Sequence, residues 1–394
     1  MNILQIATLN RPIKQDIGYG PIETVIYNID KGLHDLGHHS IVACSGDSSI
    51  TGDHVTTIDK SFSEYWSKNT REQRKNMKYH LSASLDRIKK GDIDIIHVHD
   101  AVMMEYIYKG ITKSSVPIVM TLHVPAQEKG QFNKWNESLH STSAAYFVPI
   151  SEYQNKQHHS LVNGQKVIHH GIDLEDYPFN KNIEKENYLF SIGRITPDKG
   201  QDKAIEVAKK TGSRLIIAGN IQNKEADRAF FAKIRKSIDL VVESQGSINE
   251  SDQNDYYERV MKPILESDAQ IIFIGEVNAS QKKLWYHFAR ATLFPIQWGE
   301  PFGLVLIESM ACGAPVVALN KGSVPEIVMH GKTGFVVDTI EEMAKAVMEI
   351  DKINSNDCRN HIKDNFSIAS MSRKYAELYK WIINERTLCQ KISL

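Results

Sequence analysis

The chain has 394 residues, of which 41% are apolar and 24% are charged. This composition is typical of a folded globular protein, and the length is too great for one ordinary hydrophobic core. The formal net charge of −1 argues against a nucleic-acid binder that relies on bulk charge. The four cysteines are scattered and form no CxxC pair, so neither a disulfide scaffold nor a zinc site is predicted.

The first half of the chain alternates short apolar runs with helix-like segments. The runs are continuous in apolar character, which favours a parallel sheet covered on both faces. In chain order they are Ile3–Ala7, Ser40–Ala43, Ile93–Val98, Ile118–Thr121 and Ala145–Ile150. Between the first two runs, apolar residues recur at helical spacing from Ile22 to Leu36. Pro21 suits the first turn of this predicted helix, and Gly37 suits its end.

A second strand–helix series follows the polar stretch 180–187, which reads as a linker. Its predicted strands are Tyr188–Ile192, Arg214–Ala218, Gln270–Ile274, Ala291–Phe294, Val316–Ala318 and Gly334–Val336. The long connection 220–268 is predicted to hold two helices, within 229–242 and 255–265, separated by a polar loop. The sequence therefore predicts an α/β protein with two doubly wound domains facing across a cleft.

The domain boundaries follow from this pattern. We expect an N-terminal domain over residues 1–175 and a C-terminal domain over 186–370. A helix over about 371–394 is expected to pack back on the first domain. Folds of this class bind ligands at the carboxyl ends of their strands.

Glu308 lies in a segment, 303–313, that is predicted to be a helix with apolar residues around nearly all of its circumference. Such a helix is buried, and an unpaired buried carboxylate is costly. One interpretation is a salt bridge to a buried Arg or Lys. The other is a ligand that offers hydroxyl donors, such as a ribose.

Charged residues follow two further predicted strands, where they could contact the hydroxyls or the phosphates of a ligand. Glu300 precedes the predicted helix and could be a capping carboxylate. Alternatively it could hold sugar hydroxyls beside an anion bound at the amides of Gly303 and Leu304. Arg194 and Lys199, in the turn 191–200, suit a diphosphate. The alternative for that turn is an ordinary solvated loop.

Gly18 and Gly20 lead into the first predicted helix, which permits a close approach of backbone to ligand. A dinucleotide fingerprint would need a third glycine where the chain has Glu23, so a nicotinamide cofactor is disfavoured. His97 and His99 share a strand face and could begin a metal site. No third ligand is evident, so the sequence predicts no metal.

The segments GEPFGLVLIESMACGAPVVA and GSVPEIVMHGKTGFVV resemble the signature of the retaining family 4 glycosyltransferases. These enzymes have the GT-B fold of two facing Rossmann-like domains. GRITPDKG resembles their diphosphate-binding turn, and VIHHGIDLEDY resembles the segment that joins their two domains. The resemblance covers nearly the whole chain and is strongest from Tyr188 to Val337.

The resemblance implies a role for each matching residue. Glu308 would bind the ribose, and Glu300 the donor sugar beside the reacting carbon. Arg194 and Lys199 would neutralise the departing diphosphate. The remaining implied contacts are His123 facing the donor sugar, Gly18 and Gly20 approaching the phosphates, backbone near Val277 meeting the base, and amides around Phe302, Gly303 and Leu304 holding sugar and phosphate. Considered without the resemblance, a histidine such as His123 is more often a satisfied structural residue.

The expected function is that of a metal-independent hexosyltransferase. It would move a hexosyl or N-acetylhexosaminyl group from a nucleotide-sugar, by default UDP-linked, to a hydroxyl acceptor in cell-surface polysaccharide, glycolipid or secondary-metabolite synthesis. The nucleotide-sugar is a co-substrate, so no cofactor and no nucleic-acid partner are expected. The alternatives are a non-catalytic sugar-nucleotide-binding protein, or an epimerase or phosphorylase of the same fold.

The expected location is the cytoplasm, because the opening residues read as a strand and no apolar run approaches the roughly 18 residues of a membrane span. The segment 65–92 is basic and is predicted to form a solvated helical face. Its alternative is peripheral contact with anionic lipid on the inner face of the membrane, or contact with the acceptor. The sequence does not indicate an oligomeric state.

Overall fold

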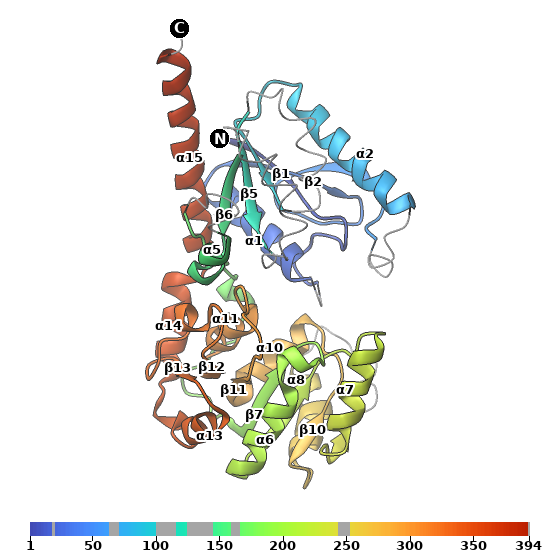
Figure 1. Ribbon diagram of the computed structural model, residues 1–394, viewed down its shortest axis with the longest axis vertical. Coiled ribbons are helices and arrows are strands. Elements are labelled where there is room, and N and C mark those ends of the chain that lie inside the picture. The colour runs from blue at the N-terminus through green and yellow to red at the C-terminus, as the bar shows by residue number, and fades with distance from the viewer. Residues whose placement is uncertain are drawn as a thin grey trace. The chain divides into compact units, whose positions relative to one another are not determined.

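The chain forms two compact α/β units in a computed structural model (Figure 1). The structure describes residues 1–17, 20–62, 71–99, 116–123, 145–158, 166–242 and 253–392. Unit 1 comprises Met1–Ile172 and Phe366–Leu394, and unit 2 comprises Asp173–Asn365. The chain therefore leaves unit 1 once and returns to it for its last segment.

Unit 1 contains a parallel sheet with the strand order β3-β2-β1-β4-β5-β6. This is the order of a Rossmann domain, and the chain changes direction between β1 and β4. The strands are β1 Asn2–Ile6, β2 His39–Ser45, β3 Asp53–Ile58, β4 Ile95–Val98, β5 Ile118–Leu122 and β6 Ala145–Pro149. The sequence analysis missed β3, because this edge strand is largely exposed and carries the polar sequence DHVTTI.

Helices cover both faces of the unit 1 sheet because side chains alternate along each strand. In β2, Ile41 and Ala43 pack in one cluster with Leu81 of α2. Val42 and Cys44 pack in another cluster with Ile26 of α1, on the opposite face. The helices in the described part of unit 1 are α1 Pro21–Asp35, α2 Arg71–Ile88, α5 Glu152–His158 and α15 Ile368–Ile392.

The C-terminal helix α15 begins at Ile368 and packs on α1. The two helices approach closely at Gly32, where an added Cβ would lie 2.0 Å from Oγ of Ser372. Tyr375 and Tyr379 of α15 are fully buried. The last helix is therefore part of the core of unit 1 although 193 residues of unit 2 precede it in the chain.

Unit 2 contains a second parallel sheet, with the order β13-β12-β11-β7-β8-β10-β9. Its strands are β7 Glu186–Ile192, β8 Arg214–Ala218, β9 Leu240–Val241, β10 Ile271–Phe273, β11 Ala289–Phe294, β12 Val316–Leu319 and β13 Gly334–Val337. Strands β8, β9 and β10 lie on one side of β7, and the chain then continues with β11 on the other side of β7. The point between β7 and β11 is thus the switch point of this sheet.

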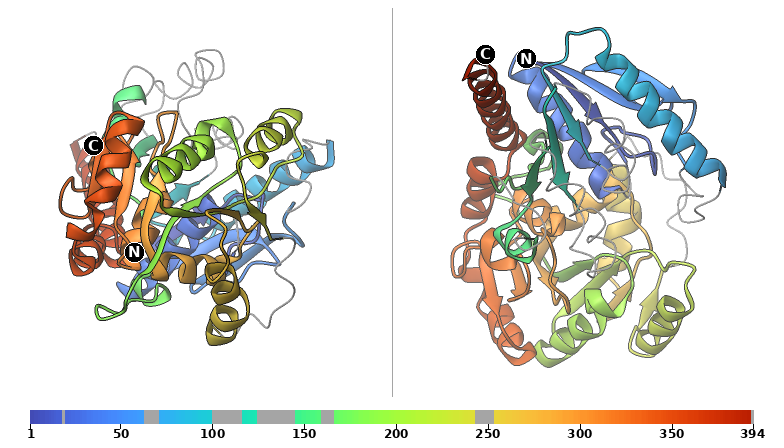
Figure 2. Two further views of the ribbon diagram at one scale, coloured as in Figure 1. Left: turned by 90° about the horizontal axis from the view of Figure 1, so that it is seen from below. Right: turned by 45° about the horizontal axis from the view of Figure 1, so that its top comes forward.

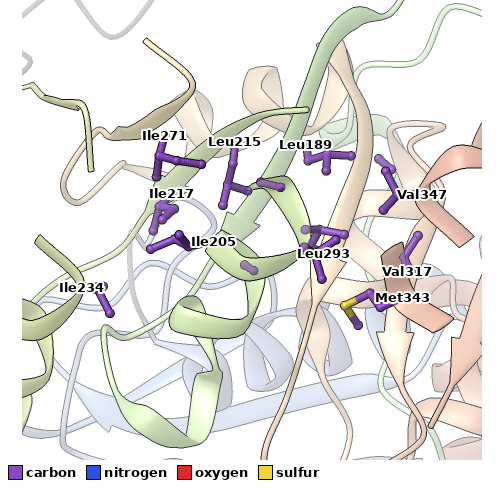
Figure 3. Close-up of a cluster of buried hydrophobic side chains, with 14 of the residues drawn as sticks. Leu189, Ile205, Leu215, Ile217, Ile234, Ile271, Leu293, Val317, Met343 and Val347 are labelled. Carbon is purple, nitrogen blue, oxygen red and sulfur yellow. The ribbon is translucent and has the colours of Figure 1, made fainter. Parts of the chain in front are cut away.

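The main core of unit 2 lies between its sheet and the helices α6, α7 and α13 (Figure 3). Leu189, Leu215 and Leu293 point from three strands toward Ile205 of α6 and Met343 of α13. Helices also lie on the other side of the strands, as Figure 2 shows in the view from below. The helices are α6 Gln201–Thr211, α7 Glu225–Arg235, α8 Gln253–Tyr256, α9 Lys262–Leu265, α10 Ala279–Phe288, α11 Leu304–Ala311, α12 Val324–Ile327, α13 Ile340–Met348 and α14 Ser355–Asn365.

The connection 220–268 differs in part from its prediction. A helix is present in the first stretch, but α7 ends at Arg235 and Leu240–Val241 forms the short edge strand β9. The prediction of one helix over 229–242 was therefore wrong at its end, because two apolar residues next to a helix are ambiguous between the two structures. The second stretch is helical, with a π-helical turn at Tyr257–Met261 between α8 and α9. Most of the predicted polar loop lies outside the described residues.

Candidate active site

Lys199 and Glu300 meet at the switch point of the unit 2 sheet. Lys199 follows β7 and Glu300 follows β11, and these strands are neighbours. Their side chains form an ion pair, with 2.6 Å between Nζ and Oε2, and both are largely buried. Nζ also lies 5.5 Å from the ring centre of Trp298. The two residues predicted separately from two motifs are therefore direct partners.

The turn that carries Lys199 is bonded to the loop after β11. Its backbone is a short 3₁₀ helix, Pro197–Lys199. The carbonyl of Asp198 accepts a bond from the amide of Gln297 (2.8 Å), and the next residue, Gly200, leaves no room for a Cβ beside the carbonyl of Pro295. This packing holds the ammonium group of Lys199 in place. The turn is therefore more than an ordinary solvated loop.

Arg194 contributes a second positive charge at this edge of the sheet. Its guanidinium lies 3.7 Å from the carboxylate of Asp198 and is partly exposed. Its own carbonyl accepts a hydrogen bond from Nε2 of Gln201, at 2.8 Å. The loop is thereby fixed through the carbonyl of Arg194, and its guanidinium remains at the surface, where it can reach an anion.

Helix α11 begins at Leu304, shortly after Glu300 in the chain, and Gly303 is the residue before its first turn. Gly303 has a φ of 84° and provides no side-chain cap. The first amides of a helix have no partner inside it, and the helix dipole makes this end an anion site. Phe302 is buried, and its carbonyl accepts a bond from the hydroxyl of Ser323 (2.7 Å). The amides of Leu304 and Val305 therefore begin an uncapped helix beside the Lys199–Glu300 pair.

Gly322 supports the backbone of Glu300. It has a φ of 63°, and a Cβ there would lie 2.3 Å from the carbonyl oxygen of Glu300. We expect Gly322→Ala to lower the free energy of unfolding by about 2–4 kcal/mol, through strained backbone and a backbone clash. Activity should fall as well, because relief of the clash displaces Glu300. Urea unfolding and transferase assays would measure the two effects.

Gly331 provides the matched control for this substitution. Its φ of 76° is equally unfavourable for alanine, but nothing lies within 4 Å of an added Cβ. Gly331→Ala should therefore show only the backbone cost, about 1 kcal/mol, with unchanged activity. Equal effects at the two positions would contradict a supporting role for Gly322.

Glu308 is buried in α11 and has three partners. Nζ of Lys282 lies 2.7 Å from Oε1, the hydroxyl of Tyr286 donates to Oε2 at 3.2 Å, and that of Tyr177 donates to Oε1 at 3.4 Å. Burial, and secondarily the charge of Glu308, raises the pKa of both tyrosines, which keeps them neutral donors. The salt bridge that the sequence offered as one interpretation is present.

These partners limit what else Glu308 can bind. A carboxylate offers about four lone-pair positions, and three are in use. A ribose that donates two hydroxyl bonds to Glu308 would have to replace one present contact, and the 3.4 Å bond from Tyr177 is the longest. Glu308 can therefore keep its salt bridge and also bind two ribose hydroxyls only if the hydroxyl of Tyr177 moves away.

Val277 lies in the loop after β10, and its side chain is buried. The next residue, Asn278, caps α10 in a reciprocal arrangement with Gln281. The carbonyl of Gly275 accepts a bond from the amide of Gly219, at 2.8 Å. The loops after β8 and β10 are thus joined at the carboxyl edge.

In unit 1, His123 lies directly after β5. Its Nε2 is 3.2 Å from Nδ1 of His99, whereas its buried Nδ1 has no hydrogen-bond partner among the described residues. Burial lowers the pKa of His123 to about 3, so the ring is neutral. Within the described residues, one ring nitrogen of His123 therefore has a partner and the other has none.

The glycines predicted before the first helix are only partly described. Gly18 lies outside the described residues. Gly20 is the residue before α1, and its backbone is extended, with a φ of 173°. Glu23, which occupies the place of a third fingerprint glycine, is buried and accepts a bond from the hydroxyl of Thr8 at 2.6 Å. A buried side chain therefore stands where a dinucleotide fingerprint has a glycine for close packing of helix against strand.

The rings of His97 and His99 are 3.9 Å apart and share a face, as predicted. Within the ranges that the structure describes, no group of three or more His, Cys, Asp or Glu residues is arranged to hold a metal ion.

Sequence reasoning missed the residues that support the site. Lys282, Tyr286 and Tyr177 surround Glu308, while Gly322 and Ser323 hold the loop of Glu300. A signal for the last two was present, because the segment GSVPE follows β12, the strand next to β11. No such signal marked the tyrosines, which resemble ordinary core aromatics.

Comparison with known proteins assigns the chain to a family. A family model described as "Glycosyl transferases group 1" matches residues 173–366, and one described as "Glycosyltransferase Family 4" matches residues 20–176. The chain belongs to the family 4 glycosyltransferases. Its chemistry is therefore the transfer of a glycosyl group, as the signature segments of unit 2 predicted.

Curated relatives of this glycosyltransferase are distant but extensive. A putative glycosyltransferase, YtcC, of Bacillus subtilis is 21% identical over 78% of this chain and 77% of its own length. The lipopolysaccharide 1,2-N-acetylglucosaminetransferase of Salmonella typhimurium is 22% identical over 81% and 80% of the two chains.

Solved structures confirm the GT-B fold of this glycosyltransferase. Sucrose-phosphate synthase from Thermosynechococcus elongatus matches with a TM-score of 0.72 at 16% identity, over 98% of this chain and 99% of its own. Anabaena HepE, in a structure with UDP and glucose, matches with a TM-score of 0.67 at 16% identity, over 96% and 99% of the two chains. Among the helices of the described ranges, none is long and apolar enough to cross a membrane.

Proposed function

We propose that this glycosyltransferase moves a hexosyl or N-acetylhexosaminyl group from a UDP-linked sugar to a hydroxyl acceptor, with retention of configuration and without a metal ion. The acceptor would be a cell-surface polysaccharide, a glycolipid or a secondary metabolite. The observation that carries the proposal is the Lys199–Glu300 pair at the switch point, beside the N-terminus of α11. The UDP and glucose complex of HepE and the lipopolysaccharide relative support the donor and acceptor classes.

The charges at this edge suit the departure of a nucleoside diphosphate. As the bond to the anomeric carbon breaks, negative charge gathers on the diphosphate, and its stabilisation is the main catalytic contribution expected. Lys199, Arg194 and the first amides of α11 would supply the positive charge that a metal ion supplies in other transferases. Glu300, held by Lys199, would accept a hydroxyl bond from the donor sugar.

Retention is proposed to follow from front-side attack. In double displacement, a carboxylate attacks the anomeric carbon. Glu300 is ion-paired with Lys199 at 2.6 Å, which makes it a weak nucleophile. The acceptor hydroxyl would therefore attack on the face from which the diphosphate leaves, and the departing phosphate would take its proton. NMR of the new glycosidic linkage tests this, and an inverted product would exclude it.

The donor is identified first by thermal unfolding with a panel of UDP-, GDP- and ADP-sugars. A donor present at 100 times its dissociation constant stabilises the fold by about 2.7 kcal/mol. We expect one donor to raise the Tm of the natural chain and to lose this effect in Glu308→Ala. Asp351→Asn is the control, because it breaks the Arg290–Asp351 ion pair of unit 2 and leaves the contacts of Glu308 unchanged.

The outcomes also separate the competing functions. A donor that binds but gives no product across a broad acceptor set would favour a non-catalytic binding protein. Product that forms without acceptor, or only with phosphate, would favour an epimerase or a phosphorylase. A Tm shift that survives in Glu308→Ala would remove the proposed ribose contact and leave Lys282 as the structural partner of Glu308.

A further inference from the structure

Three buried side chains of unit 1 form a hydrogen-bonded relay that ends at a fourth, half-buried one, His123. Nε2 of Gln5 donates to Oγ of Ser40 at 2.9 Å. Oε1 of Gln5 lies 3.1 Å from Nε2 of His99, and Nδ1 of His99 lies 3.2 Å from Nε2 of His123. Gln5, Ser40 and His99 are at most 1% exposed. The relay therefore crosses from β2 through β1 and β4 to the end of β5.

The relay has a direction, because an amide oxygen can only accept. Nε2 of His99 must therefore carry a proton and donate it to Oε1 of Gln5. Burial, and secondarily the neighbouring histidines, lowers the pKa of His99 well below its usual value, so the ring holds one proton and its Nδ1 is an acceptor. The proton between the two histidines then belongs to Nε2 of His123.

We propose that Gln5 and His99 are positioning residues that hold His123 as the Nε2–H tautomer, so that its bare Nδ1 accepts a hydrogen bond from a ligand hydroxyl. This rests on the proposed function, in which a sugar binds at the carboxyl edge of the unit 1 sheet. Nδ1 of His123 is buried and has no partner in the described part of the chain. A nitrogen in this state binds a hydroxyl and repels a phosphate oxygen.

The reverse arrangement is the competing one. If the amide of Gln5 were rotated, every bond of the relay would reverse and Nδ1 of His123 would carry a buried proton without an acceptor. Orphaned buried N–H donors are rarer in proteins than unmet acceptors, which favours the direction described. The reversed relay would instead suit a phosphate or carboxylate oxygen at the same place.

The tautomer is measured directly by ¹⁵N NMR on the full chain labelled at histidine, because the protonated and bare ring nitrogens of a neutral imidazole resonate far apart. His123 is assigned by its loss in His123→Asn. We expect the natural protein to show Nε2–H and bare Nδ1 at His123. A proton on Nδ1 would overturn the proposal, whatever the activity.

Variants of Gln5 test whether the relay sets this state. Gln5→Met has similar volume and no acceptor, so His99 loses its constraint and His123 should show mixed tautomers. Gln5→Glu keeps an accepting oxygen and should keep Nε2–H. A Gln5→Met protein with the natural tautomer would overturn the role of the relay.

Thr121→Val is the matched control. The hydroxyl of Thr121 contacts Nε2 of His97 and the hydroxyl of Tyr375, each at 2.7 Å. Its loss removes no hydrogen bond of the relay, although it frees Nε2 of His97, whose ring lies 3.9 Å from that of His99. The tautomer of His123 should be unchanged.

Kinetics separate this proposal from the proposed function. Gln5→Met should raise KM about fivefold for the sugar that His123 contacts, the cost of one weakened hydrogen bond, with a smaller effect on kcat. Gln5→Glu should restore the natural KM. If no sugar nucleotide is turned over by the natural chain, the proposed function fails, while the tautomer measured by NMR still decides the relay.

Discussion

Replacement of Lys199 by methionine should slow glycosyl transfer by about 10²–10³-fold, mainly through kcat. The ammonium group of Lys199 lies 2.6 Å from the carboxylate of Glu300, at the switch point where a diphosphate would depart. Methionine retains the length of the stem and its packing but removes the charge. Steady-state kinetics with the donor identified by thermal unfolding would measure the effect.

A structural role for the pair must be separated from this catalytic one. Removal of one partner from a buried ion pair leaves the other uncompensated, whereas removal of both can be nearly neutral. Lys199→Met and Glu300→Gln should therefore each lower stability, and the double variant should recover much of it while remaining inactive. Lys203→Met is the control, because Lys203 lies one turn away and forms an ion pair with Glu206, near the surface. Activity that recovers together with stability would contradict a catalytic role for Lys199.

Acidification from pH 6.5 to 4 should destabilise unit 1 before unit 2. Burial lowers the pKa of a set of unit 1 histidines, namely His80, His97, His99, His123 and His170. In the described part of unit 2, burial lowers the pKa of two histidines, the buried His287 and the half-buried His361. Unit 1 therefore has more histidines whose protonation at acid pH opposes folding than the described part of unit 2 has.

The sign follows from proton binding. The pKa of His80 falls from 6.5 in the unfolded chain to about 4 on folding, so the unfolded state binds more protons below pH 6.5. Stability is complete above that pH and is lost as the pH falls toward 4. For His80 alone the loss at pH 5 is about 2 kcal/mol. The pKa values of the other buried histidines of unit 1 shift in the same direction, so their protonation adds to this loss.

Hydrogen–deuterium exchange at pH 7, 6 and 5, corrected for intrinsic exchange rates, would measure this order of unfolding. Amides of β1, β4 and β5 should lose protection first, and those of β7, β8 and β11 later. His80→Gln keeps polar contacts with Thr57 and the carbonyl of Ala7 in reach and should reduce the loss by about one histidine's share. Equal loss of protection in both units would contradict the prediction.

The local sequence predicted much of the fold because parallel strands and their helices have strong periodic signals. Five of the six unit 1 strands and six of the seven unit 2 strands were expected near their observed positions. The missed strands, β3 and β9, are edge strands of which one is polar and one has only two residues. Edge strands bury less apolar surface, and so they leave the weakest pattern in a sequence.

The sequence by itself predicted which residues carry the chemistry. Glu308 was noticed because it is an acidic residue on a helix that is otherwise apolar around nearly all of its circumference. Arg194 and Lys199 were noticed because they are cations in the turn after β7, at a strand end. These inferences needed only residue type, spacing and family resemblance. They concern single segments, in which the chain's own neighbours dictate the structure.

Only the tertiary structure decided which of these residues are partners. Lys199 and Glu300 are 101 positions apart, and Tyr177 reaches Glu308 across 131. The relay to His123 joins four strands, with 94 positions between Gln5 and His99. Such pairs exist because β11 lies beside β7, and β4 beside β1. Local periodicity predicts that strands form, but their order depends on how the whole sheet packs beneath its helices, and that order brings distant side chains together.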